Sequence, residues 1–233
     1  MRPLVIIPTF NERANLPTLV EQLLTLSDLR ILIVDDASPD GTGQIADGYA
    51  AANRARVQVL HRTGRRGLGL SYIDGMYVAL RTDSTHICQM DADLSHNPAD
   101  IPRLLDAAQR AEFVVGSRYV QGGRIENWPI HRRVLSAFAN RYIRAITRMT
   151  IRDCTSGFRC WRREALERLP LASIRSDGYA FIVELAWEAS RAGFRCAEVP
   201  ITFVERREGA SKLSWPVMVE SAIVPWRLAA RRR

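Results

Sequence analysis

The chain has 233 residues, of which 47% are hydrophobic and 25% are charged, and this composition excludes a disordered protein. No window approaches the roughly 18 uninterrupted apolar residues of a membrane-spanning helix, and the first residues become polar too quickly for a secretory signal. We therefore expect an intracellular protein whose four cysteines, which lack paired zinc-type spacing, stay reduced.

The net charge of +8 belongs entirely to the second half of the chain. Residues 1–117 carry 11 basic and 14 acidic side chains, whereas residues 118–233 carry 22 and 11, so the net charges are −3 and +11. This asymmetry predicts that the second half meets something anionic, such as phosphate groups, a membrane surface or nucleic acid. The alternative is a generally basic surface that keeps the protein soluble.

The first 117 residues alternate between short apolar runs and longer amphipathic stretches. We expect strands at 4–7, 30–34, 57–60, 86–91 and 113–118. We expect one helix over 16–24, a second that begins at Thr42, a third that ends at Ala79 and a fourth that begins near Pro98. This alternation predicts an α/β fold in which helices cover both faces of a mostly parallel sheet. Ligands of such sheets bind outside the carboxyl ends of the strands. Polar residues gather at these ends in this chain: 9–12, Asp35, Asp36, Asp91, Asp93, Ser117 and Arg118.

Asp91 and Asp93 follow an apolar run at the point where a strand is expected to stop. If the extended geometry continues through Ala92, the two carboxylates point to the same side. Like charges on one face repel each other unless a cation lies between them, and the usual cation is a hard divalent ion bound through oxygen. The alternative is that one Asp caps the next helix and the other is solvated.

The second half has a different organisation. Residues 131–150 predict a long amphipathic helix rich in arginine, which either packs on the core or lies on an anionic membrane surface. Residues 196–204 predict a strand near a sheet edge, because Pro200 cannot donate to a ladder. The tail 215–233 is either a surface anchor or a docked helix. Between the helix 131–150 and the strand 196–204 we expect a polar turn at 153–159 and helices at 163–169 and 180–192.

Six segments occur in the order seen in one known family of enzymes. They are 8–12 (PTFNE), 34–42 (VDDASPDGT), 90–96 (MDADLSH), 116–119 (GSRY), 155–159 (TSGFR) and 198–203 (EVPITF). Together they resemble the inverting GT-A glycosyltransferases of family two and, more narrowly, the dolichol-phosphate or polyprenol-phosphate mannosyltransferases. The resemblance covers nearly the whole chain, from Leu4 to Ser214.

The resemblance implies a single GT-A catalytic domain over 1–233, with a Rossmann-like sheet and a C-terminal basic region of helices and an edge strand. Residues 1–117 would form the nucleotide-sugar-binding half, residues 118–214 the acceptor-binding half, and residues 215–233 an amphipathic basic tail. The implied reaction transfers mannose from GDP-mannose to the phosphate of a polyprenol, with inversion at the anomeric carbon.

The family's motifs imply roles for particular residues of the donor site. Asp91 and Asp93 match the metal motif, in which Mg²⁺ or Mn²⁺ bridges the diphosphate and offsets charge on the departing GDP. The implied nucleotide-sugar-binding residues are Pro8, Thr9, Phe10, Asn11, Glu12, Asp36, Asp91 and Lys212. The family often has Tyr where Phe10 stands, so a hydroxyl contact is missing here. Some relatives have Gln where Ser95 stands, and water is expected to take that place in the metal shell.

Other matches concern the acceptor. Arg118, Arg132 and Ser136 resemble positions that hold the acceptor phosphate, and the last two share a helical face because they are spaced i, i+4. Arg206 and Lys212 resemble the family's basic loop over the diphosphate, although the adjacent Arg207 could exchange roles with Arg206. The implied catalytic residues are Asp91, Asp93, Arg118 and Arg206.

The implied reaction needs no general base. A phosphate monoester has a second pKa near 6, so it is mostly dianionic at neutral pH and is already a nucleophile. The enzyme has to position this dianion and keep it from repelling the donor diphosphate, which suits arginine side chains. The arginine-rich second half of the chain provides them.

The expected partners are GDP-mannose, polyprenol phosphate and an anionic membrane surface, and not nucleic acid. We expect a cytoplasmic protein that is peripheral on the cytoplasmic face of a membrane, bound directly or through a separate membrane-anchoring protein. One alternative is a glucosyltransferase that uses UDP-glucose and the same lipid. A nucleotidyltransferase is disfavoured because residues 8–12 replace its glycine-rich segment. A nucleic-acid-binding protein would explain the basic half but not the carboxylates at the strand ends.

Overall fold

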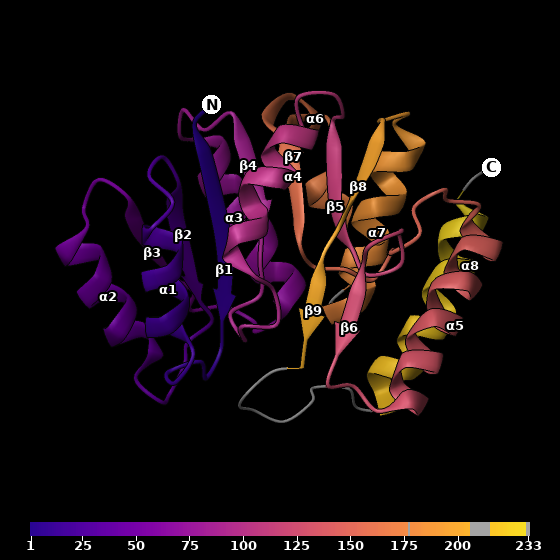
Figure 1. The fold of residues 1–233 in the computed structure, drawn as a ribbon, viewed down its shortest axis with the longest axis horizontal. Helices are drawn as coiled ribbons and strands as arrows, with labels where there is room; N and C mark the ends of the chain where they lie inside the picture. The colour runs from indigo at the N-terminus through magenta and orange to yellow at the C-terminus, as the bar shows by residue number, and fades with distance from the viewer. Residues whose placement is uncertain (177, 206–214, 232–233) are drawn as a thin grey trace.

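A seven-stranded sheet forms the centre of the computed structural model, which describes residues 1–176, 178–205 and 215–231 (Figure 1). The strands run in the order β3-β2-β1-β4-β7-β5-β8, and neighbours are parallel except that β7 is antiparallel to β4 and β5. The strands are β1 (Pro3–Thr9), β2 (Arg30–Asp35), β3 (Val57–His61), β4 (His86–Gln89), β5 (Phe113–Ser117), β7 (Arg159–Arg162) and β8 (Cys196–Pro200). The predicted α/β fold with a mostly parallel sheet is confirmed.

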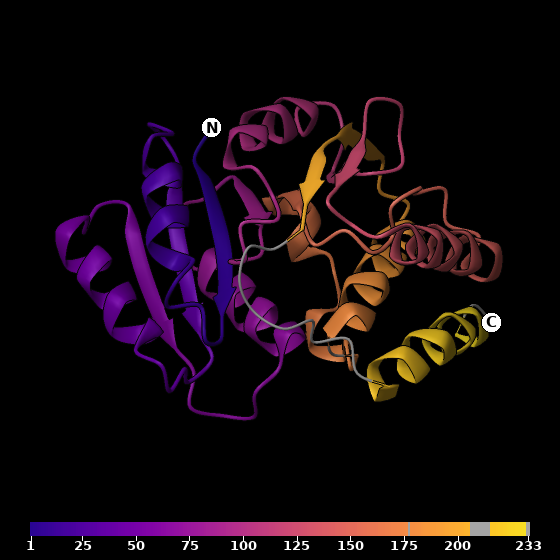
Figure 2. The same ribbon diagram turned by 60° about the horizontal axis from the view of Figure 1, so that its bottom comes forward.

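Helices cover both faces of this sheet. The helices are α1 (Leu16–Leu24), α2 (Thr42–Ala52), α3 (Leu68–Leu80), α4 (Ile101–Ala107), α5 (Ile130–Thr147), α6 (Arg163–Glu167), α7 (Gly178–Arg191) and α8 (Trp215–Ala230), with 3₁₀ turns η1 (Pro98–Asp100) and η2 (Leu171–Ser173). One core cluster joins the sheet to α1, α2 and α4, and the other joins it to α3, α6 and α7. α5 and α8 lie together at the end of the molecule opposite β3 (Figure 2). None of the described helices is long and apolar enough to cross a membrane.

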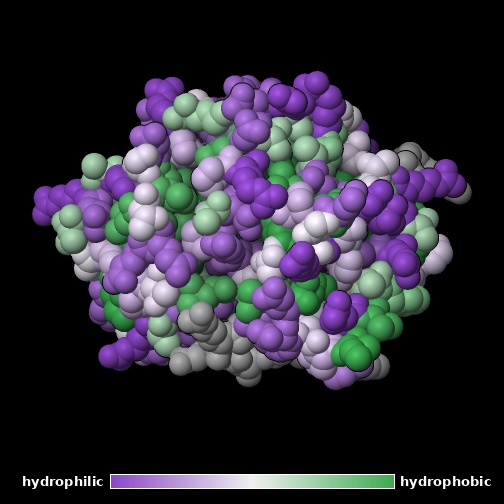
Figure 3. Space-filling model, viewed as in Figure 1, coloured by the Kyte–Doolittle hydropathy of each residue, from purple (hydrophilic) through white to green (hydrophobic). Residues whose placement is uncertain are grey.

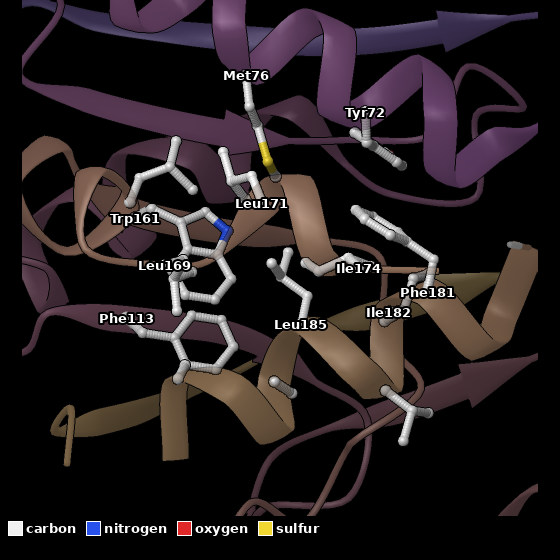
Figure 4. Packing of buried hydrophobic residues seen from close by; sticks show 14 of the residues in the cluster. Tyr72, Met76, Phe113, Trp161, Leu169, Leu171, Ile174, Phe181, Ile182 and Leu185 are labelled. Carbon is white, nitrogen blue, oxygen red and sulfur yellow. The ribbon is translucent and has the colours of Figure 1, made fainter. Parts of the chain in front are cut away.

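The core next to α7 is rich in aromatic side chains (Figure 4). The rings of Phe113 and Trp161 stack with centroids 3.9 Å apart, and those of Tyr72 and Phe181 stack at 5.9 Å. Buried Tyr and Trp need a partner for their polar atom, and Trp161 donates to the side-chain oxygen of Gln89 at 2.7 Å. Because Gln89 ends β4, this packing fixes the strand that leads into the acidic pair.

Residues 196–204 were predicted as one strand, and this prediction is wrong in one respect. The chain leaves the large sheet at Ile201, after which β9 (Thr202–Val204) pairs in parallel with β6 (Arg124–Glu126) in a separate two-stranded sheet. The backbone N–H of Ile201 still donates to Ser117 at 3.0 Å, whereas its carbonyl accepts from Arg124 at 2.9 Å. Ile201 is therefore the joint between the two sheets. The predicted edge position of β8 is confirmed.

β7 was not predicted, since residues 153–159 were expected to form a polar turn with a helix after it. The strand is only four residues long and begins and ends with arginine, yet it lies between β4 and β5 in the middle of the sheet. Arg159 is fully buried and donates to the backbone carbonyls of Cys154, Ser156 and Ile182 at 2.7 to 3.0 Å. Burial lowers the pKa of Arg159 to about 10, so the guanidinium remains charged at neutral pH.

Candidate active site

The carboxyl ends of β1 and β2 carry a network of buried polar groups. The hydroxyl of Thr9 donates to Asp35 at 3.2 Å, and the backbone carbonyl of Thr9 accepts from the N–H of Asp36 at 2.9 Å. Asp36 also accepts from the buried guanidinium of Arg62 and, at 2.8 Å, from the N–H of Gly67. The carboxylate of Asp36 therefore holds the segment 62–67 over the strand ends. No sequence spacing pairs Arg62 with Asp36, because the two residues lie 26 positions apart.

The loop after β1 brings Phe10, Asn11 and Glu12 to the same edge. The guanidinium carbon of Arg66 lies 4.7 Å from the centre of the Phe10 ring, so segment 62–67 also reaches this loop. Asn11 has a φ of 58° and donates its N–H to a serine at 3.1 Å, and the carboxylate of Glu12 accepts from Asn15 at 2.8 Å. Pro8 is buried within β1. Of the predicted nucleotide-binding residues that are described, 8–12 and Asp36 lie at the ends of the adjacent strands β1 and β2, and Asp91 follows β4.

The acidic pair lies on a turn, because β4 ends at Gln89. Oδ1 of Asp93 accepts from the N–H of Ser95 at 3.1 Å and from its hydroxyl at 2.5 Å, and the intervening Leu94 has a left-handed φ of 61°. The strand predicted over 86–91 ends two residues earlier than expected, so the condition for placing both carboxylates on one side of a strand is not met. The alternative that an Asp caps the next helix is also wrong, since the side chain of Asn97 caps η1.

Two other parts of the chain contact Asp91. The buried hydroxyl of Tyr72 donates to its Oδ1 at 3.0 Å. The backbone of Gly157 also lies close, because a Cβ added there would be 3.1 and 3.3 Å from the two carboxylate oxygens, so a larger residue would require a shift. Burial raises the pKa of Tyr72 well above its usual value, and the charges of Asp91 and Asp93 raise it further. Tyr72 therefore remains a neutral hydrogen-bond donor at neutral pH.

The donor set of the acidic pair fits a hard divalent cation. Asp91 and Asp93 both offer carboxylate oxygens, which are the ligands that Mg²⁺ and Mn²⁺ prefer. The hydrogen bonds from Tyr72 and Ser95 orient the two carboxylates, as outer partners of metal ligands do. Within residues 1–176, 178–205 and 215–231, no three His, Cys, Asp or Glu side chains cluster closely enough to hold a metal ion.

His96 joins this turn to Phe158, which precedes β7, and to β9. Its ring stacks on Phe158 at 5.1 Å and meets the edge of Phe203 at 5.3 Å, and Nδ1 has no hydrogen-bond partner among the described residues. Burial lowers the pKa of His96, although the charges of Asp91 and Asp93 oppose that effect. The imidazole is therefore neutral at neutral pH.

Arg118 follows β5 and is held by a buried carboxylate that the sequence did not indicate. Its backbone N–H, Nε and Nη2 donate to Asp153 at 2.9, 2.8 and 2.7 Å, and Nη2 also reaches Thr155 at 2.7 Å. Burial would raise the pKa of Asp153, but the attraction of Arg118 outweighs burial and leaves the pKa below its usual value. The guanidinium carbon also lies 5.3 and 5.8 Å from the rings of Phe203 and Trp128.

Arg132 and Ser136 lie on one face of α5, as predicted from their spacing. The guanidinium of Arg132 lies 4.1 Å from the centre of the Trp128 ring and pairs with Glu205 at 2.5 Å. The hydroxyl of Ser136 accepts from that of Tyr119 at 2.7 Å. The predicted loop residues Arg206 and Lys212 lie outside the described residues.

A groove of about 590 Å³ opens between α5 and residues 118–126. It is lined by Arg118, Tyr119, Gly123, Arg124, Ile125, Glu126, Ile130, Arg133, Val134 and Ala137. Its wall on α5 continues onto the surface, because Ile130 and Val134 are 77% and 63% exposed. Large exposed apolar side chains nearby are Leu135 and Phe138 on α5 and Ile223 and Trp226 on α8. Figure 3 shows hydrophobic side chains gathered over the lower part of α5, between hydrophilic ones.

The fold and the site together define a GT-A glycosyltransferase. Residues 4–170 match the model of glycosyl transferase family 2. The chain is 49% identical over 215 residues to the polyprenol monophosphomannose synthase of Mycolicibacterium smegmatis, which covers 91% of this chain and 81% of that protein. It is 44% identical over 240 residues to the undecaprenyl-phosphate mannosyltransferase of Micrococcus luteus, with 99% and 96% covered. The chain therefore belongs to glycosyl transferase family 2.

Solved structures support the same fold. Glucosyl-3-phosphoglycerate synthase from Mycobacterium tuberculosis, solved with Mn²⁺ and UDP, matches with a TM-score of 0.70 at 20% identity, over 98% of this chain and 78% of that one. A mannosyltransferase from Pyrobaculum calidifontis, solved with GDP-mannose and Mn²⁺, matches with a TM-score of 0.58 at 17% identity, over 99% and 73%. These likenesses establish the GT-A architecture of the chain.

Proposed function

We propose that the protein transfers mannose from GDP-mannose to polyprenol phosphate and forms polyprenol-phosphate mannose with inversion. The main support is the 44 to 49% identity, over most of the chain, to two enzymes whose names specify mannosyl transfer to a lipid phosphate. The groove adds a physical reason, since it combines three arginines with an apolar wall that reaches the surface. A charged phosphate on an apolar chain needs both features.

On the donor side, we assign the nucleoside to the strand ends that carry Thr9, Phe10, Glu12 and Asp36. Carboxylates at such positions accept hydrogen bonds from a base or a ribose. Asp36 already accepts from Gly67, so segment 62–67 would form one wall of the nucleoside site. Pro8, Asn11, Arg206 and Lys212 are assigned to the same donor by the family's motifs.

Asp91 and Asp93 would hold the divalent metal, Mg²⁺ or Mn²⁺. When bound, the metal offsets the negative charge that grows on the departing GDP. The protein's own contribution is to orient both carboxylates. Tyr72 and Ser95 each donate a hydrogen bond to one of them, and Gly157 leaves room for Asp91.

The acceptor phosphate would lie near Arg118, Arg132 and Ser136. One of its oxygens attacks the anomeric carbon of mannose, the bond from that carbon to GDP breaks, and no proton has to be removed from the dianion. Arginine side chains orient the phosphate and reduce its repulsion from the diphosphate. Arg124 and Arg133 also line the groove and are further candidates for this contact.

The exposed face of α5 would lie on the anionic cytoplasmic surface of a membrane. Apolar side chains such as Phe138 would enter the interface, and exposed arginines such as Arg141 would meet lipid headgroups. This orientation brings the groove to the leaflet that holds the lipid substrate.

The test is sugar transfer to a short polyprenyl phosphate, with labelled GDP-mannose and UDP-glucose in parallel, in Mg²⁺, in Mn²⁺ and with a chelator. We expect a mannosylated lipid that requires a metal. Product from UDP-glucose alone would keep the site but replace the donor, and product in the presence of chelator would refute the metal assignment.

A further inference from the structure

Arg132 and Glu205 form an ion pair next to the acceptor groove. Nη1 of Arg132 lies 2.5 Å from Oε1 of Glu205, although the two residues are 73 positions apart in sequence. The Trp128 ring lies against this guanidinium, and the same ring lies 5.8 Å from the guanidinium carbon of Arg118. A carboxylate of the chain therefore occupies one of the arginines that the proposed function assigns to the acceptor phosphate.

The two carboxylates that pair with the arginines assigned to the acceptor differ in burial and in the number of oxygens that contact the arginine. Asp153 is completely buried and accepts from Arg118 through both oxygens, so separating that pair would leave a buried charge without a partner. The side chain of Glu205 is 34% exposed and meets Arg132 through one oxygen. Glu205 can therefore leave its arginine and be solvated, whereas Asp153 cannot.

The charge of the groove is too small for its proposed ligand while Glu205 stays in place. Arg118 is neutralised by Asp153, and among the other groove-lining residues the charge of Glu126 offsets one of two arginines, Arg124 or Arg133. Among the groove-lining residues that the structure describes, a single positive charge remains to face a phosphate dianion. Release of Arg132 from Glu205 would supply the second.

We propose that Glu205 is an internal competitor of the acceptor phosphate: it holds Arg132 in the free enzyme, and the phosphate displaces it. The inference rests on the proposed function and adds a determinant of acceptor affinity to it. When only a fraction of the free protein is in the form that can bind, the apparent Kd equals the Kd of that form divided by this fraction. If one free enzyme in about five has Arg132 released, the acceptor binds about fivefold more weakly than the site allows.

The opposite role for Glu205 makes the opposite prediction. If this carboxylate were a brace that orients Arg132 for the phosphate, its removal would let the guanidinium move and would weaken acceptor binding. The sign of the change in acceptor affinity therefore separates the two roles.

Glu205→Gln removes the charge and keeps the size of the side chain. We expect the KM for a short polyprenyl phosphate to fall about fivefold, which is ~1 kcal/mol at 1.4 kcal/mol per tenfold and lies within the range of a partly exposed ion pair. The KM for GDP-mannose should stay within about twofold of the wild-type value. In an Arg132→Ala background, Glu205→Gln should leave the acceptor KM unchanged, because no arginine remains to be released.

Glu112→Gln is the matched control. Glu112 pairs with Arg195 at 3.0 Å and its side chain is 25% exposed, so it is a similar ion pair, but neither residue lines the groove. An equal fall in acceptor KM for both variants, or an unchanged or raised KM for Glu205→Gln, would overturn the proposal. Calorimetric titration of the short polyprenyl phosphate without donor gives the same comparison without turnover. It therefore tests the displacement of Glu205 even if the wild-type protein transfers no sugar.

Discussion

Gly157→Ala tests whether the position of Asp91 sets metal binding. The new Cβ would lie 3.1 Å from Oδ2 and 3.3 Å from Oδ1 of Asp91, which is closer than ordinary van der Waals contact. The backbone of Gly157 is not in the left-handed region, so alanine introduces no strain of its own. Asp91 therefore has to shift by a few tenths of an ångström, which also disturbs its hydrogen bond from Tyr72.

The magnitude follows from the size of this shift. A misplacement of about 1 Å at a reacting centre can cost about a hundredfold in rate, so ~0.3 Å corresponds to roughly three- to fivefold. Stability should hardly change, because a cost of about 1 kcal/mol for overpacking is offset by the 0.4–1 kcal/mol or so that alanine gains over glycine through the unfolded chain. The effect on activity is thus separate from the effect on folding.

The assay is the initial rate of sugar transfer against Mg²⁺ concentration, together with the urea midpoint of the same preparation. We expect the rate at saturating Mg²⁺ to fall about three- to fivefold and the half-saturating Mg²⁺ concentration to rise, at an unchanged urea midpoint. Gly48→Ala is the control, since a Cβ there meets nothing within 4 Å; it should leave the rate unchanged and stabilise α2 by about 0.5–1 kcal/mol. A folded Gly157→Ala protein with wild-type metal dependence would refute the role of Asp91.

Four further changes have defined outcomes. Tyr72→Phe removes the hydrogen bond to Asp91, so Mg²⁺ titration of activity should show weaker metal binding, with a stability loss of at most about 1.5 kcal/mol. Asp153→Asn leaves a buried arginine without its counter-charge and should cost about 3–5 kcal/mol in urea unfolding. The pKa of His96 is lowered in the fold, so its contribution is complete above pH ~6.5 and is lost as pH falls towards the lower folded value; His96→Gln should therefore reduce the drop in stability from pH 7.5 to 5.5. Phe138→Ser changes a side chain that is 63% exposed, so stability should stay within about 0.5 kcal/mol while flotation with anionic vesicles falls roughly tenfold.

The sequence was sufficient to predict helices with an amphipathic pattern that continues over many residues and strands that are buried on both faces. β1 and β2 are continuous apolar runs because both faces of a parallel sheet are covered, and α5 has a clear amphipathic pattern. β7 was missed since four residues with arginine at both ends show no strand pattern, and their pairing depends on β4 and β5. β6 was missed for a similar reason, as a three-residue strand depends on β9 for its hydrogen bonds.

The motifs gave the candidate site residues, but they did not reveal which side chains hold them. The partners come from distant parts of the chain: Arg62 reaches Asp36 across 26 positions, and Glu205 reaches Arg132 across 73. Such pairs depend on the three-dimensional arrangement of loops at the edge of the sheet and have no spacing that a single sequence could reveal. Gly157 belongs to one of the motifs, but the reason for a glycine there is visible only in the structure. Its close approach to Asp91 excludes any larger residue without a shift.

The segment 153–159 contacts both parts of the proposed site. Asp153 holds Arg118, which we assign to the acceptor, Gly157 packs against Asp91, which we assign to the donor, and Arg159 donates to three backbone carbonyls. The proposed reaction needs the acceptor phosphate and the donor diphosphate at a defined separation, although both are negatively charged. Because one rigid segment contacts both sides, a change that displaces it should alter the KM of the donor and of the acceptor together, whereas a change at Glu205 should alter that of the acceptor alone.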